Sequence, residues 1–263
     1  MRKSWSMGAL VPFALLPALV GCADREASSG DGGSAPADGG AANAVAGAEE
    51  LRSDPATRTM LDFIAKHEGE PDERGRTIDK SKPNWRMLLP RPPRLEFTPG
   101  RKYLLHMETN HGPMTFELRP DLAPMHVSNA IYLALVGFYE GNTSHRTGRG
   151  FMVQAGAPDG RGGGNLGYAL DLEADKRHVY DRPGLLAAAR TPDPHSAGSQ
   201  FFVMFGASPQ LNFQYTIYGE FADAQKTESM ITLRKLEQSS NPSPSTGPPL
   251  KPIVFEKMTV SVE

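Results

Sequence analysis

The stretch SHRTGRGFMVQAG, residues 144–156, decides the fold of this chain. Within it, Met152 and Gln154 stand two residues apart. Because side chains alternate between the two faces of a strand, both project from the same face. Gln200 and Phe202 repeat this spacing further along the chain. Each pair can therefore present an apolar wall beside a polar amide.

The residues around this stretch predict a mostly β fold. Apolar and polar residues alternate over 103–108 and 114–118 on either side of a turn, which predicts a β-hairpin. Helical spacing of apolar residues predicts helices over 124–137 and 226–238, and alternation over 258–262 predicts a closing strand. An antiparallel barrel with two helices fits this pattern, since closure leaves no sheet edge exposed.

Three ordered blocks resemble the cyclophilin family of peptidyl-prolyl cis-trans isomerases. Residues 144–156 are similar to the family pattern of His-Arg, four residues and Phe-Met-x-Gln-x-Gly. Residues 189–202 resemble the second block, in the version found in bacterial periplasmic members, and residues 211–219 resemble the third. The resemblance spans about Tyr103 to Val262. It implies a closed, eight-stranded antiparallel barrel that is capped by two α-helices.

The resemblance also implies the chemistry of the site. Prolyl isomerisation breaks no covalent bond, and its barrier of about 18–20 kcal/mol is lost amide resonance, so neither a cofactor nor a metal is needed. The twisting proline nitrogen regains a lone pair, which a cationic donor stabilises more than it stabilises the planar states. By resemblance, Arg146 is this catalytic donor, and Gln154 steadies it and binds the substrate carbonyl.

The substrate, a proline-containing polypeptide, is expected to bind at the other matched positions. By resemblance, these supply an apolar pocket for the proline ring and a backbone segment for the residues before it. The positions are Phe151, Met152, Ala189, Arg190, Gln200, Phe202, Leu211 and Tyr215.

Some positions depart from the family pattern. The family usually has Phe where Ser144 stands, and an apolar run where residues 147–149 are Thr-Gly-Arg. We therefore expect a less rigid loop around Arg146. Gln210 stands where cyclosporin-sensitive relatives carry tryptophan, so we expect weak inhibition by cyclosporin. The alternative to an enzyme is a non-catalytic proline-peptide-binding module or holdase chaperone, although a pure binder needs no donor at the imide nitrogen.

Three other motifs point to chemistry that we do not expect here. Residues 162–167 fit the dinucleotide-binding pattern G-x-G-x-x-G, but no apolar helix follows and no βαβ unit surrounds them, so we expect a loop. The seven histidines show no metal-ligand spacing, and we expect no metal. Ser196 and Ser199 lie near His195 but lack the G-x-S-x-G elbow of hydrolases.

Composition narrows the possible partners. The 263 residues carry a formal net charge of −2 with both signs mixed, so we expect no nucleic-acid partner. Cys22 is the only cysteine, which excludes an intramolecular disulfide and a cysteine zinc site. We expect a monomer that binds a peptide.

The N-terminus has the pattern of a targeting signal. Two basic residues precede an apolar run over 7–20, which is typical of a secretory signal and shorter than the roughly 20 residues of a transmembrane helix. The sequence LVGC at 19–22 resembles the bacterial lipobox, which implies cleavage before Cys22 and its acylation. Acyl chains would anchor the protein to a lipid bilayer. Ala23 favours the outer membrane by resemblance to enterobacterial sorting. An ordinary signal with an incidental cysteine is the alternative.

These patterns divide the chain into four segments. The first is a lipoprotein signal peptide, the second a tether rich in Ala, Gly and Ser that cannot form a core. The third combines a short helix with a Pro-rich stretch, and the fourth is the cyclophilin-like domain. Their bounds are 1–21, 22–50, 51–99 and 100–263.

The third segment begins with a capped helix. Asp54-Pro55 precedes apolar residues at helical spacing, which predicts a helix that ends near Gly69. The prolines between residues 80 and 99 favour extended backbone, which we interpret as a stiff spacer, the alternative being a partner-binding motif.

Overall fold

The computed structural model describes residues 47–242 and 246–263. The predicted signal peptide, the lipobox with Cys22 and most of the predicted tether lie outside the described residues. In the part of the chain that is described, no helix combines the length and the apolar character needed to cross a membrane.

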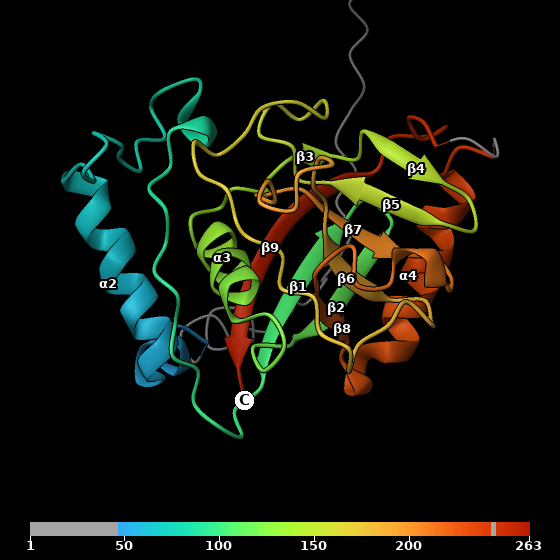
Figure 1. Ribbon diagram of the computed structural model, residues 1–263, viewed down its shortest axis with the longest axis horizontal. Coiled ribbons are helices and arrows are strands. Elements are labelled where there is room, and N and C mark those ends of the chain that lie inside the picture. Colours follow the sequence, from blue (N-terminus) through green and yellow to red (C-terminus); the bar gives the residue numbers. More distant parts are fainter. Residues whose placement is uncertain (1–46, 243–245) are drawn as a thin grey trace, which may run out of the picture. The chain divides into compact units, whose positions relative to one another are not determined.

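One antiparallel sheet dominates the described residues, as the alternating sequence patterns predict (Figure 1). Its strand order is β3-β9-β1-β2-β8-β6-β7-β5-β4. The predicted hairpin and closing strand are confirmed as β1, β2 and β9. The strands are β1 (Tyr103–Thr109), β2 (Gly112–Leu118), β3 (Asn142–Thr143), β4 (Arg146–Gly148), β5 (Met152–Ala155), β6 (Leu185–Ala188), β7 (Phe201–Met204), β8 (Ile217–Phe221) and β9 (Val254–Val262).

The sheet differs from the predicted closed barrel of eight strands. The described residues contain nine strands, and the sheet is open, with β3 and β4 at its two ends. These two strands are consecutive in the chain, and Ser144 and His145 separate them. β3 pairs with β9 and β4 pairs with β5. The hydrogen-bonded ladder is therefore interrupted at Ser144 and His145, which leaves a half-barrel.

After a helical stretch at residues 47–53, three α-helices accompany the sheet, and two of these are the predicted helices of the domain. They are α3 (Pro124–Leu135), which packs against β8 and β9, and α4 (Lys226–Ser239), which packs against β2 and β5. The third, α2 (Pro55–Gly69), has the predicted bounds, and Asp54 caps it by accepting a hydrogen bond from the Thr57 N–H at 2.9 Å. Short 3-10 helices cover Trp85–Met87, Pro209–Leu211 and Asp223–Gln225.

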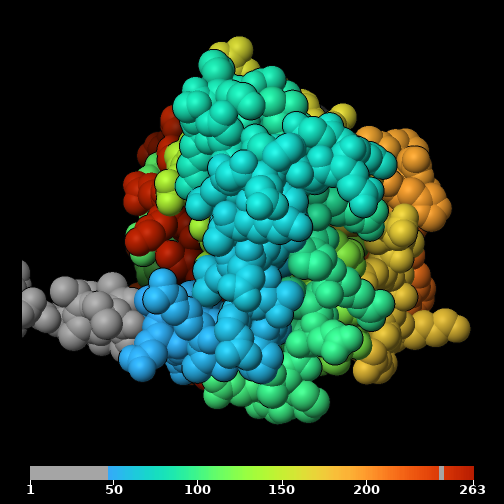
Figure 2. Space-filling view, turned by 90° about the vertical axis from the view of Figure 1, so that its left-hand side faces the viewer, coloured from blue at the N-terminus to red at the C-terminus, as the bar shows by residue number. Residues whose placement is uncertain are grey.

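The segment 51–99, called the extension from here on, is part of the hydrophobic core. Met60 of α2 and Leu89 in the Pro-rich stretch are fully buried, and Leu95 is nearly so. Figure 2 shows the extension, coloured blue to teal, covering much of one face. The prediction of a stiff spacer is therefore wrong, because leucines between the prolines find apolar partners on the domain.

A buried carboxylate joins the extension to the sheet. Asp54 accepts hydrogen bonds from Tyr103 Oη at 3.0 Å and from Thr98 Oγ1 at 3.2 Å, in addition to capping α2. Tyr103 belongs to β1 and is completely buried. The start of α2, the end of the Pro-rich stretch and the first strand thus meet at one side chain.

Candidate active site

Arg146 lies at the outer end of the sheet, where the hydrogen bonds of two neighbours orient it. It faces Gln154 across the β4–β5 ladder, and its Nη1 donates to Gln154 Oε1 at 3.1 Å. Its Nε donates to Thr246 Oγ1 at 2.8 Å. The side chain remains exposed to solvent. A charged guanidinium is therefore held in a fixed orientation where a substrate can reach it.

Hydrogen bonds hold the segment that carries Arg146, at the positions where the family usually has apolar residues. Ser144 Oγ donates to the Gln154 carbonyl at 2.9 Å. Thr147 is completely buried and exchanges backbone hydrogen bonds with Gly247 at 2.6 and 2.9 Å. The looser loop that we expected around Arg146 is not what these contacts indicate, because polar anchoring replaces apolar packing.

A small pocket of about 100 Å³ opens beside Arg146. The structure brings together at this pocket both residues predicted as catalytic and all but one of those predicted to bind substrate. The residues lining it are Arg146, Phe151, Met152, Gln154, Ala189, Arg190, Phe202, Leu211 and Tyr215. The exception, Gln200, lies behind Gln154 and accepts a hydrogen bond from its Nε2 at 2.9 Å.

Two neighbouring strands supply the floor of this proline pocket, as we name it from here on. Gln154 of β5 is the register partner of Phe202 of β7, so the two predicted apolar and amide pairs project from the same side of the sheet. Phe202 stacks on Tyr180 with ring centroids 6.1 Å apart and meets the edge of Tyr215 at 5.7 Å. Met152 and Phe202 are almost completely buried. The pocket thus has a preformed apolar floor.

Arg190 shapes the rim of the proline pocket. Its guanidinium donates twice to the Gln214 carbonyl, at 2.8 and 2.6 Å, and lies 4.8 Å from the centre of the Tyr215 ring. Ala189 and Arg190 follow β6 directly, and the Ala189 N–H donates to the Gln200 carbonyl at 2.9 Å. Their backbone therefore continues β6 beyond its last residue, next to the pocket, where a peptide can lie alongside it.

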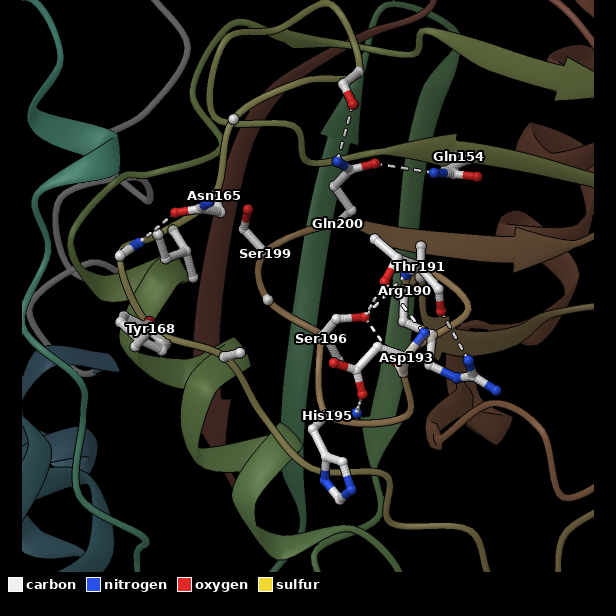
Figure 3. Close-up of a pocket in the computed structure, with 18 of the residues that line it drawn as sticks. Gln154, Asn165, Tyr168, Arg190, Thr191, Asp193, His195, Ser196, Ser199 and Gln200 are labelled. Carbon is white, nitrogen blue, oxygen red and sulfur yellow. Dashed lines mark hydrogen bonds between the residues drawn. The ribbon is translucent and has the colours of Figure 1, made fainter.

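A second pocket of about 760 Å³ adjoins the first, and both are lined by Gln154, Ala189 and Arg190. Gln200 links them, because it accepts from Gln154 and donates from its Nε2 to the Gly162 carbonyl at 3.2 Å (Figure 3). Residues 162–167 form a loop, as predicted, and this loop contributes to the wall of the second pocket.

The serine and histidine motifs from which we expected no chemistry show no catalytic arrangement in the described residues. Ser196 Oγ donates to the Asp193 carbonyl, Ser199 Oγ donates to the Gly156 carbonyl, and His195 pairs with Asp171 at 2.8 Å on the surface. Neither serine of this motif is therefore bonded to His195. Burial lowers the pKa of His145, beside Arg146, which favours its neutral form near pH 7. Over residues 47–242 and 246–263, no three His, Cys, Asp or Glu side chains gather in a way that could hold a metal ion.

Two residues that contribute to the site carry no signal in the sequence. Thr246, which binds Arg146, lies in a low-complexity loop one hundred positions away in the chain, and no local pattern singles it out. Arg74 of the extension lines the second pocket, although the extension lies outside the region of resemblance. Long-range contacts of this kind leave no periodic signal in a single sequence.

Comparison with known proteins identifies the family. The family model described as "Cyclophilin type peptidyl-prolyl cis-trans isomerase/CLD" matches residues 104–260. Peptidyl-prolyl cis-trans isomerase A of Mycobacterium tuberculosis is 34% identical over 170 residues, which cover 59% of this chain and 90% of that protein. A cyclophilin-type isomerase of Cryptosporidium parvum has a crystal structure that superimposes with a TM-score of 0.54 at 31% identity, covering 60% of this chain and 97% of that chain.

A second crystal structure of the Cryptosporidium parvum isomerase was determined in the presence of the dipeptide Ala-Pro, and it aligns with a TM-score of 0.53 at 32% identity, over 60% of this chain and 98% of that chain. The match over more than half of the chain favours an enzyme over the non-catalytic binding module. The chain belongs to the cyclophilin family and is a peptidyl-prolyl cis-trans isomerase.

Proposed function

We propose that this isomerase acts on proline-containing polypeptides by directing the Arg146 guanidinium at the nitrogen of a twisted X-Pro amide. The main support is the location of Arg146 at the mouth of an apolar pocket, held by Gln154 and Thr246. The dipeptide used with the Cryptosporidium parvum relative supports a proline-containing ligand.

Arg146 and Gln154 have enough hydrogen-bond donors to bind both the protein partners and the substrate. A guanidinium offers five N–H donors, and two hydrogen bonds to protein partners leave others free for the proline nitrogen. That nitrogen gains a lone pair only as the bond twists, so the interaction favours the transition state over both planar states. Gln154 Nε2 gives one hydrogen to Gln200 and keeps the other for a substrate carbonyl.

Replacement of Arg146 tests the mechanism. We expect Arg146→Ala to lower kcat/KM for a prolyl peptide at least tenfold, which corresponds to about 1.4 kcal/mol of transition-state stabilisation. Arg146→Lys should recover only part of the rate, because an ammonium lacks the planar fork. Exchange between the cis and trans peptide, followed by NMR, measures the rate directly.

Arg149→Ala is the matched control. Arg149 is exposed on the same segment, and its Nη2 donates to the Gln238 carbonyl outside the proline pocket. This variant should retain most of the wild-type rate. Unchanged turnover in a folded Arg146→Ala protein would refute the proposed mechanism.

The proposed clients are folding proteins of a bacterial envelope, reached from a lipid anchor at Cys22. The support is the sequence LVGC after a short apolar run, with the outer membrane favoured by Ala23. In a bacterial host, the wild-type protein should incorporate a radioactive fatty acid and sediment with membranes, whereas Cys22→Ser should incorporate none. A wild-type protein without label would rule out the lipid anchor and leave the isomerase mechanism untouched.

A further inference from the structure

The extension reaches the wall of the second pocket. Figure 3 shows Asn165 and Tyr168 on one side of this pocket and Asp193 and Ser196 on the other. Of the described residues that line it, Arg74 alone comes from the extension. The extension lies outside residues 104–260, the part that matches the family. Arg74 is therefore a feature of this chain in addition to the family domain.

Asp72 fixes the turn that presents Arg74. Its Oδ1 accepts hydrogen bonds from the N–H groups of Arg74 and Arg76, both at 2.9 Å. Its Oδ2 lies 2.8 Å from Arg76 Nε and 2.7 Å from Nη2. Gly75, with φ of 73°, provides the left-handed residue that the turn requires. The backbone at Arg74 is thus held in place by several hydrogen bonds.

Arg76 and Met87 join the extension to the glycine-rich loop of the second pocket. Arg76 Nη1 donates to the Gly167 carbonyl at 2.9 Å. A Cβ atom added at Gly164 would lie 2.9 Å from the terminal methyl of Met87, so the loop and the extension are in close contact. The extension therefore supports this wall of the pocket.

Arg74 is the unpaired cation of the second pocket. Within the described chain, its side chain has no hydrogen bond or ion pair, and it is exposed. Arg190, the other arginine of the lining, donates to backbone carbonyls, including that of Gln214. Asp193 contributes a negative charge on the far wall, and His195 pairs with an aspartate outside the lining. A ligand carboxylate thus finds one free guanidinium here.

We propose that Arg74 is a specificity-determining residue that binds an acidic side chain shortly before the isomerised proline. The inference rests on the proposed function, in which the backbone of Ala189 and Arg190 binds the residues that precede proline. A chain that continues along this backbone enters the second pocket. Since an extended residue spans about 3.3 Å, the three residues before the proline would cover about 10 Å of this pocket. A carboxylate there can pair with the guanidinium fork.

Charge reversal tests this proposal with matched peptides. The peptides carry Glu, Ala or Lys at each of the three positions before proline, and NMR exchange measures kcat/KM with wild type and with Arg74→Glu. We expect Arg74→Glu to lower kcat/KM about threefold or more for a Glu peptide at low salt, and to leave Ala peptides unchanged. A Lys peptide at the same position should gain, and both effects should shrink at high salt.

Arg234→Glu is the control, because Arg234 is an exposed arginine of α4 that lines neither pocket of the site. It introduces the same charge change and should not alter the preference among the peptides. An equal loss on Glu, Ala and Lys peptides, or no change on any, would overturn the role of Arg74. Failure of the proposed function is a separate result, since Arg146→Ala would then leave turnover of every peptide intact.

Discussion

The family-matched domain and the extension belong to one folded unit but are built differently. In the domain, each strand pairs with its neighbours in the sheet through ladder hydrogen bonds. The extension contains helical residues 51–53, the helix α2 and a single 3-10 turn, and the rest of it is irregular backbone. Nevertheless Met60 and Leu89 of the extension are as fully buried as Tyr103 of β1. A segment can thus join a core through a few buried side chains without adding to the sheet.

Replacement of Asp54 is the most direct way to disrupt the contact between the extension and the domain. Asp54→Ala removes the cap of α2 and leaves the hydroxyls of Tyr103 and Thr98 without their acceptor. A lost cap costs about 0.5–2 kcal/mol and an unsatisfied buried group about 1–3 kcal/mol. We therefore expect the free energy of unfolding to fall by about 2–4 kcal/mol, measured by urea denaturation.

Trp85 allows the same denaturation experiment to test whether the extension and the domain unfold together. It lies in the extension and packs edge-on against Phe138, and the only other tryptophan, Trp5, lies in the predicted signal peptide. In protein without residues 1–21, tryptophan fluorescence and far-UV circular dichroism should give coincident transitions. Asp62→Ala, an exposed change on α2, should stay within about 0.5 kcal/mol of wild type. Separate transitions would show that the extension unfolds independently.

Local periodicity predicted much of the domain, and motif resemblance predicted the set of residues at the proline pocket. The hairpin, α3 and α4 each follow from the spacing of apolar residues within their own segment. The interruption at Ser144 and His145 was not predictable in this way, because β3 pairs with the distant β9 whereas β4 pairs with the neighbouring β5. The docking of Leu89 on the domain was not predictable either, because isolated leucines among prolines show no periodic pattern.

The N-terminus of α3, in the domain, can be compared with that of α2, in the extension. Its cap residue, Ala123, offers no side-chain acceptor. Instead Glu173, from a distant loop, accepts hydrogen bonds from the N–H groups of Met125 and His126 at 3.0 and 2.9 Å and lies 2.7 Å from His126 Nδ1. Burial of the Glu173 carboxyl raises its pKa, but these hydrogen bonds outweigh burial, so the pKa lies below its ordinary value.

We expect Glu173→Gln to reduce the free energy of unfolding at pH 7 by about 1 kcal/mol, because a carboxylate at a helix N-terminus is stabilising. A group whose pKa is lower in the folded state stabilises the protein above its unfolded pKa of about 4.3. The difference between variant and wild type should therefore disappear as the pH falls through the folded pKa of Glu173. Urea denaturation at several pH values measures it. Glu256→Gln, at an exposed position, should show no such dependence, and a difference that does not shrink as the pH falls below the unfolded pKa would contradict the explanation.

Phe213 marks a strained position at the edge of the proline pocket. Its φ is 62°, and it is the only non-glycine residue with a positive φ in the described chain. Hydrogen bonds anchor both neighbours, since Asn212 Oδ1 accepts from the Tyr180 N–H at 2.8 Å and the Gln214 carbonyl accepts from Arg190. The turn is thus held in a conformation that Phe213 itself does not favour.

The smallest predicted effect is a reversal of the usual order of alanine and glycine at this position. Both Phe213→Ala and Phe213→Gly remove the same half-exposed ring. The difference in free energy of unfolding between the two variants therefore reports on the backbone conformation at this position. Glycine is ordinarily less stabilising than alanine by about 0.5–1 kcal/mol, but a left-handed L-residue costs about 1–2 kcal/mol, which glycine avoids. Phe213→Gly should therefore be the more stable variant by about 0.5–1 kcal/mol in urea denaturation. Ile231, equally half-exposed but helical, should show the ordinary order, with glycine less stable by about 1 kcal/mol. If alanine is also the more stable residue at position 213, the turn has relaxed out of the left-handed conformation, and its neighbours do not hold it there.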